Sequence, residues 1–247
     1  MNAVYRIALT TIQELFHERV FYLLGAFAIL AMFLSVLLGD LTFAEQGKIT
    51  LDFLLAGTEF TSVLFSVFMG ITLLNRELNL GWIAMVLSKP ITRTQFLFGK
   101  FLGQLGIQAV VIGFLGGIIA LLCLARGIPL VPEALFQSLL LTFCEGMVLS
   151  ALVYLCTVNL GALLSATVSL SFYALGNFST HHQPDTLLTA LRAVLPNFQI
   201  FNIKTLVSYG LLLDWGLLGL AVLYALVCTG LYFCLASITF SRRDIFT

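Results

Sequence analysis

The side chains best placed for chemistry in this sequence are two glutamates that stand in or beside long apolar stretches. Glu145 falls in the middle of the apolar run Leu135–Val158, and Glu59 directly precedes the run Phe60–Leu74, at its outer end. A carboxylate near the centre of a bilayer costs a few kcal/mol even on permissive insertion scales, so Glu145 is expected to face protein or water. Three interpretations stay open for Glu145: a place in a substrate path, structural pairing within the bundle or across a dimer, and a protonated side chain without a specific role.

Thiols and imidazoles are the groups of this chain that can bind metal ions. All the cysteines fall within or at the edge of apolar runs, and their number is odd: Cys123, Cys144, Cys156, Cys228 and Cys234. We interpret them as small buried apolar residues; the alternative is a path for copper, which soft thiols bind. His181-His182 can also bind metal, but two adjacent histidines in a loop are more typical of solvated side chains. We therefore predict no metal site.

The common catalytic motifs are missing. Gly99-Lys100 lacks the earlier glycine and the hydroxyl residue of a phosphate-binding loop, and His17-Glu18 lacks the second histidine of a zinc-protease helix. A G-x-S-x-G nucleophile motif is also absent. The sequence therefore predicts a chain that is not itself an enzyme and holds no cofactor.

The segment from Asn75 to Lys100 places charged residues between two long apolar runs. It contains five of the chain's 24 charged residues, namely Arg76, Glu77, Lys89, Arg93 and Lys100. Pro90 disfavours helix at Lys89, so a short helix from about Glu77 is expected to end there, with apolar residues on one face. Such a helix can dock into a groove of a soluble partner and transmit a push. The alternative is a basic loop that only fixes topology.

The composition places these residues in an all-α membrane protein with a single domain over residues 1–247. Hydrophobic residues make up 60 % of the chain and charged residues 10 %, and the mean hydropathy is +1.05. The net charge of zero gives no argument for a nucleic-acid partner. Six apolar runs are long enough to predict transmembrane helices: Val20–Leu38, Phe60–Leu74, Phe96–Leu124, Leu135–Val158, Leu160–Phe178 and Leu211–Ile238. The second run is expected to extend outward past Glu59, and Asn159–Gly161 is the expected turn between the fourth and fifth runs.

The distribution of basic residues predicts the orientation in the membrane. With the N-terminus inside, eight Lys and Arg residues lie on the cytoplasmic side and four on the outer side. Both termini are therefore expected to be cytoplasmic, with 75–95 as the main cytoplasmic loop. The outer segments are then Gly39–Thr58, Arg126–Ala134 and Ser179–Gly210, of which the last is expected to form a re-entrant or interfacial segment.

Residues 1–19 are predicted to form an amphipathic helix on the membrane surface, with a plain cytoplasmic tail as the alternative. Apolar residues recur there at helical spacing: Val4, Ile7, Ala8, Thr11, Ile12, Leu15 and Phe16. The fifth run has small and hydroxyl residues that favour close helix packing: Gly161, Ser165, Thr167, Ser169, Ser171 and Gly176.

The loop and the topology together resemble the type-2 ABC-transporter permease family, which includes the copper-system permease of nitrous oxide reductase maturation. The resemblance covers about 30 residues, together with the six predicted spans and the closing Ser241–Phe246 tail. Its motifs are specific for the superfamily and not for a substrate, and Trp82 departs from the small or hydroxyl residue more usual at its position. The residues that carry it are Arg76-Glu77, Gly81, Leu87-Ser88-Lys89-Pro90-Ile91-Thr92-Arg93 and Gly99-Lys100.

This resemblance implies a permease subunit of an ATP-driven exporter in a cell membrane, typically the bacterial inner membrane. Two copies of a separate ATPase subunit are then expected to hold ATP and magnesium, and a second permease subunit completes a homo- or heterodimer. The implied coupling helix would contact the ATPase through Arg76, Glu77, Gly81, Trp82, Ser88, Lys89, Pro90 and Arg93. The alternative function is an ATP-independent membrane transporter or a membrane assembly scaffold. No internal repeat is visible, which argues against a secondary transporter.

Overall fold

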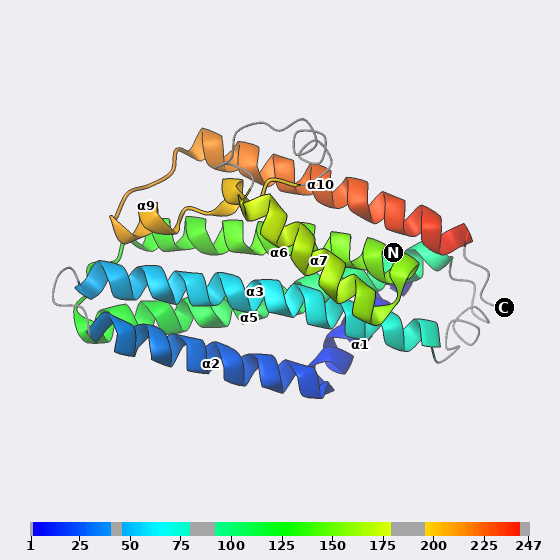
Figure 1. The fold of residues 1–247 in the computed structure, drawn as a ribbon, viewed down its shortest axis with the longest axis horizontal. Helices are drawn as coiled ribbons and strands as arrows, with labels where there is room; N and C mark the ends of the chain where they lie inside the picture. The colour runs from blue at the N-terminus through cyan, green and yellow to red at the C-terminus, as the bar shows by residue number, and fades with distance from the viewer. Residues whose placement is uncertain (1, 41–45, 80–91, 179–195, 243–247) are drawn as a thin grey trace.

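The computed structural model of the chain describes residues 2–40, 46–79, 92–178 and 196–242, and over these residues it is helical without strands (Figure 1). The coupling residues Gly81, Trp82, Ser88, Lys89 and Pro90, together with His181-His182, lie outside the described residues. The elements are α1 (Asn2–His17), α2 (Arg19–Asp40), α3 (Gln46–Asn79), α5 (Arg93–Arg126), α6 (Pro132–Leu160), α7 (Ala162–Phe178), the 3₁₀ turn η1 (Phe198–Phe201), α9 (Lys204–Ser208) and α10 (Trp215–Arg242).

Five of these helices, α2, α3, α5, α6 and α10, are long and apolar enough to cross a membrane. They coincide with five of the six predicted runs, so the prediction of an all-α chain with the build of a multi-pass membrane protein is confirmed. The remaining predicted run corresponds to α7, which is also apolar but only 17 residues long. The turn between α6 and α7 lies where it was predicted, because Gly161 adopts a φ of 78°, which suits glycine.

Most of the segment 39–58, which was predicted to lie on the outer side, is helical, because α3 begins at Gln46. Leu51, Leu54, Leu55 and Thr58 are buried at helical spacing and extend the core-facing side of α3 upstream of Glu59. The one polar residue between them, Asp52, is partly buried. The helix α3 is consequently longer than the predicted run Phe60–Leu74, and it extends upstream past Glu59, as the sequence predicted.

The centre of the bundle is formed by α3 and α6. In their most apolar windows 72 % and 78 % of residues are buried, against 22 % for both α2 and α10. Figure 1 shows α2 along α3 at one edge of the bundle and α10 along α6 at the other. The helix α1 and the C-terminal end of α10 lie at the same end of the bundle, and α9 lies at the opposite end beside the start of α3.

The predicted amphipathic helix is present as α1, and its apolar stripe packs against α5. A side chain at Gly99 or Gly103 of α5 would come within 2.8 Å of Ile7 or 2.6 Å of Thr11, so glycine is needed for this approach. Lys100 lies between the two glycines and forms an ion pair with Glu14, with 2.6 Å between Nζ and Oε2. The Gly-Lys pair of the sequence therefore holds α1 onto the bundle.

Candidate functional site

A seam of polar side chains lies in the middle of the bundle, between α3, α5 and α6. It is formed by Ser62 and Ser66 of α3, Gln104 and Gln108 of α5, and Ser150 of α6, none of which is more than 2 % exposed. The two residues that α3 contributes are four apart, as are the two from α5, so each pair shares one helix face. Buried polar groups at this depth need hydrogen-bond partners from neighbouring helices, because no water is available there to bond with them.

The glutamine side chains connect the three helices of the seam. The Nε2 of Gln108 donates to the Oγ atoms of Ser62, at 3.1 Å, and Ser66, at 3.0 Å. The Nε2 of Gln104 donates to the carbonyl of Ser66 at 3.1 Å and to Oγ of Ser150 at 3.2 Å. The Oε1 of Gln104 is buried and has no hydrogen-bond partner among the described residues, and an unmade bond of this kind costs about 1–3 kcal/mol. The seam is therefore a specific hydrogen-bond network in which one amide oxygen is not paired with another described group.

Gly146 of α6 makes room for the seam. Its carbonyl accepts a hydrogen bond from Oγ of Ser66 at 3.1 Å. A Cβ at this position would lie 1.7 Å from Nε2 of Gln108 and 2.8 Å from Oγ of Ser62. A larger residue at position 146 would therefore displace the glutamine that joins α5 to α3.

A second polar cluster, which we call the acid–lysine cluster, lies closer to the α9 end of the bundle. It consists of Glu59 of α3, Glu145 of α6, Tyr173 of α7 and Lys204 of α9. The Nζ of Lys204 lies 2.5 Å from Oε2 of Glu59, and the hydroxyl of Tyr173 donates to Oε1 of Glu59 at 3.2 Å. Three helices that are distant in the sequence, α3, α7 and α9, thus meet through the Glu59 carboxylate.

Glu145 faces the same cluster and is only 3 % exposed. Its carboxyl lies within electrostatic reach of Glu59 and Lys204. The acid–lysine cluster therefore contains two carboxyls and a single ammonium group. Burying two carboxylates against one cation is unfavourable, because one of the two charges would have no counter-ion.

The acid–lysine cluster includes both glutamates that the sequence singled out, and it adds Tyr173 and Lys204, which sequence reasoning missed. Lys204 belongs to the segment 196–210, which packs into the bundle through Phe198, Phe201 and Val207, all nearly inaccessible to solvent. The rings of Tyr173 and Phe198 lie 5.1 Å apart and hold this segment against α7.

The described part of the predicted coupling loop is anchored by its two arginines. Nη1 of Arg76, near the end of α3, lies 2.8 Å from Oε1 of Glu18, between α1 and α2. Nη1 of Arg93, at the start of α5, donates to the backbone carbonyl of Ser241 at 3.3 Å, at the end of α10. Glu77 lies in α3, which continues to Asn79. Cations bound to the carbonyls of a helix C-terminus are favourable there.

The cysteines are free thiols, and their burial is uneven. Cys123, Cys144 and Cys156 are buried, as the sequence predicted, and Cys228 is partly buried. The prediction of burial is wrong for Cys234, which lies on a face of α10 that no described helix covers. Over the described residues, His, Cys, Asp and Glu side chains form no group of three that can hold a metal ion.

Comparison with protein-family models and with curated proteins finds no match for this chain. The functional assignment therefore depends on the residues and the geometry described above.

Proposed function

We propose that this chain is the transmembrane permease subunit of an ATP-driven ABC exporter. The observation that carries the proposal is the anchoring of the loop 75–95 at both of its ends. Arg76 connects the end of α3 to the α1–α2 junction, and Arg93 connects the start of α5 to the end of α10. A force applied to this loop by a soluble partner would therefore act on five helices together. A loop that only fixes topology has no need of such contacts.

The proposed topology has six crossings, with α7 as the fifth. A helix of 17 residues rises about 25 Å at 1.5 Å per residue, which is at the short end of what spans a bilayer core. The neighbouring contacts support a crossing. The side chain of Gln137, near the start of α6, is hydrogen-bonded to the backbone of Leu213, just before α10. Because α6 and α10 begin at the same end of the bundle, the chain must return across it between them.

In this proposal α3 connects the cytoplasmic loop with the acid–lysine cluster. Arg76, the seam residues Ser66 and Ser62, and Glu59 all belong to α3. From Arg76 to Glu59 the helix rises about 25 Å. A displacement of α3 by the partner would move the seam and pull on the Lys204–Glu59 pair, which ties α9 to the bundle. The cluster would then lie beside the path that opens during transport.

The partners follow from the same proposal. Two copies of a separate ATPase would hold ATP and magnesium, and a second permease subunit would complete the translocation path as a homo- or heterodimer. Both termini and the loop 75–95 would lie on the cytoplasmic side of a cell membrane, in bacteria the inner membrane. An ATP-independent transporter or an assembly scaffold would need no ATPase at this loop, which is how the two classes can be separated.

The test is purification of the tagged full-length chain from its native membrane in mild detergent. We expect an ATP-hydrolysing subunit to copurify, in a ratio of one to each copy of this chain, and to be lost when Glu77 and Lys89 are both replaced by alanine. A chain that purifies without any nucleotide-hydrolysing partner, and still transports in liposomes without ATP, would refute the proposal in favour of the secondary transporter.

A further inference from the structure

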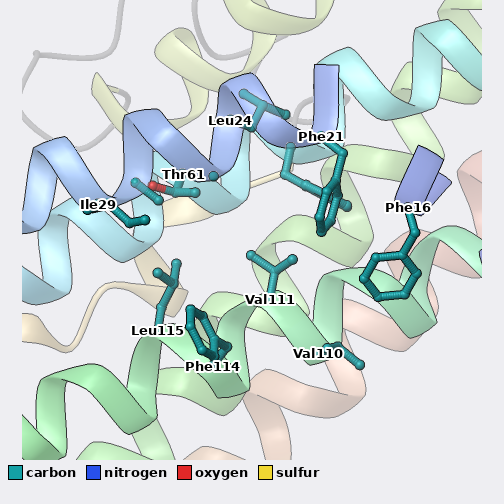
Figure 2. Close-up of a pocket in the computed structure, with 12 residues that line it drawn as sticks. Phe16, Phe21, Leu24, Ile29, Thr61, Val110, Val111, Phe114 and Leu115 are labelled. Carbon is teal, nitrogen blue, oxygen red and sulfur yellow. The ribbon is translucent and has the colours of Figure 1, made fainter. Parts of the chain in front are cut away.

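An apolar groove runs between α2 and α5 on the face of the bundle away from α10. Its floor is formed by buried residues of α2 and α3, including Leu24, Ala28 and Phe65, and its volume is about 280 Å³. The rims are formed by side chains that are more than half exposed, such as Ile29 of α2 and Phe114 of α5. Figure 2 shows these side chains facing one another across the gap between the two helices.

The groove has almost no polar surface of its own. Thr61 is the only polar side chain among the described residues that line the groove. Its hydroxyl donates to the carbonyl of Gly57 at 2.8 Å and is thereby satisfied within α3. The α2 residues that line the groove run from Phe21 to Ile29, a rise of about 12 Å. Both α2 and α5 are long enough to cross a membrane, so the groove opens where hydrocarbon surrounds the protein.

The volume of the groove decides what can occupy it. A whole transmembrane helix, about 10 Å across, cannot enter this groove and could only lie over it and insert single side chains, whereas one hydrocarbon chain can lie along it. A methylene group is close in size to a water molecule, whose share of volume is about 30 Å³, so 280 Å³ holds about nine or ten methylenes. The size fits one stretch of hydrocarbon chain.

The α1 end of the groove is positively charged. Phe16 of α1 closes this end and contacts Phe21, with ring centroids 5.1 Å apart. The two acidic residues there are neutralised, because Glu14 pairs with Lys100 and Glu18 pairs with Arg76. One exposed cation, Arg19, follows Glu18 directly in the sequence and belongs to neither pair. A surface with this surplus attracts the phosphate of an anionic lipid, at about 1 kcal/mol for each basic residue.

We propose that the groove between α2 and α5 binds one acyl chain of an anionic phospholipid, whose headgroup lies at the α1 end beside Arg19. The site is distinct from the acid–lysine cluster and needs no ATPase to bind a lipid, although its α1 end adjoins the Glu18–Arg76 pair. The bound chain fills the space between two helices that do not otherwise pack together, and it fixes the position of α2 relative to α5.

Two glycines provide a matched pair of variants. Gly25 lines the groove, and Gly113 of α5 does not, but a Cβ at either position meets no atom within 4 Å. The backbone therefore leaves room for a side chain at either position: Gly25→Leu places one in the groove, and Gly113→Leu adds the same side chain elsewhere on the apolar surface. Arg19→Gln removes the charge and leaves the groove open.

The experiment is native mass spectrometry of the full-length chain, delipidated in detergent and titrated with either phosphatidylglycerol or phosphatidylcholine. We expect one phosphatidylglycerol bound to the unmodified chain and to Gly113→Leu, and at least about tenfold weaker binding to Gly25→Leu. Arg19→Gln should weaken phosphatidylglycerol about fivefold, to near the level of phosphatidylcholine. If Gly25→Leu fails to fold, Phe114→Ala, which removes one exposed wall of the groove, should weaken binding several-fold.

Three outcomes would overturn the inference. Equal binding of phosphatidylglycerol to Gly25→Leu and Gly113→Leu would show that no lipid uses the groove. Equal binding of both lipids to the unmodified chain would overturn the assignment of an anionic headgroup. Loss of self-association in Gly25→Leu, with lipid binding unchanged, would show that a side chain of a second copy fills the groove instead.

Discussion

The ion pair between Lys204 and Glu59 gives the sharpest test of the acid–lysine cluster. Lys204→Met keeps the length of the side chain and removes its charge, which leaves Glu59 next to Glu145 without a cation. Breaking one partner of a buried pair costs about 3–5 kcal/mol. The two side chains retain 20 % and 12 % exposure, so we expect the lower end, about 3 kcal/mol, or more than a hundredfold in the unfolding equilibrium.

A double-mutant cycle separates the pair from its surroundings. Glu59→Gln keeps an acceptor for the Tyr173 hydroxyl, and the double variant with Lys204→Met removes both charges. We expect the double variant to recover most of the loss, which gives a coupling energy of about 2 kcal/mol or more. The measurement is equilibrium unfolding of the purified chain in mixed micelles of rising sodium dodecyl sulfate, followed by circular dichroism.

The exposed pair between Arg76 and Glu18 is the matched control, since its side chains are 52 % and 25 % exposed at a similar separation of 2.8 Å. The cycle of Arg76→Met and Glu18→Gln should give less than about 1 kcal/mol, as solvent-screened pairs do. A coupling energy for Glu59 and Lys204 no larger than this control would refute the buried cluster, because it would mean that water reaches both charges.

Three further predictions test the seam, the loop and the orientation. Gly146→Ala should lower the free energy of unfolding in the same assay by about 2–4 kcal/mol, because Gln108 must leave its serine partners. The control Gly113→Ala should change it by less than about 1 kcal/mol. Equal effects of the two variants would contradict the packing of the seam. The Glu77→Ala variant should insert normally but reduce copurification of the ATPase at least about tenfold. Lys48→Ala, at the other end of the bundle, is the control. If the loop variant behaves like this control, the loop serves only to fix the topology. Lys48→Cys should react with a membrane-impermeant maleimide only from outside intact cells, and labelling only from the cytoplasmic side would reverse the proposed orientation.

The sequence predicted the helices well because their apolar runs are long and nearly free of charge. It placed an outer segment at residues 39–58 and expected the second span to extend past Glu59, whereas α3 begins as far upstream as Gln46. The helix continues because Leu51, Leu54 and Leu55 still face the core. Local hydrophobicity cannot reveal this, since it averages over all faces of a helix. The helical spacing of Leu51, Leu54 and Leu55 is what indicates that the helix continues.

The candidate site was only half predictable for a related reason. The cost of a charge in hydrocarbon singles out Glu145 and Glu59 from sequence alone. It says nothing of Lys204, which lies 145 residues after Glu59 and reaches it only because the segment 196–210 folds back into the bundle. The spacing of Gln104 and Gln108 in an apolar run was a visible signal of a seam. Its partners on α3 and α6 depend on how the helices pack.

The two polar groupings have opposite consequences for motion, and both involve α3. In the seam, α3 meets α5 and α6 through hydroxyls, amides and Gly146, which are short groups that can exchange partners when a helix shifts. The unpaired Oε1 of Gln104 means that the present arrangement does not satisfy every group, so an alternative register costs less than in a fully bonded network. At the acid–lysine cluster, by contrast, α3 is tied to α9 by an ion pair whose rupture leaves a buried charge. The seam can therefore exchange hydrogen-bond partners more readily than the acid–lysine cluster, where breaking the ion pair between Glu59 and Lys204 leaves a charge without its counter-ion.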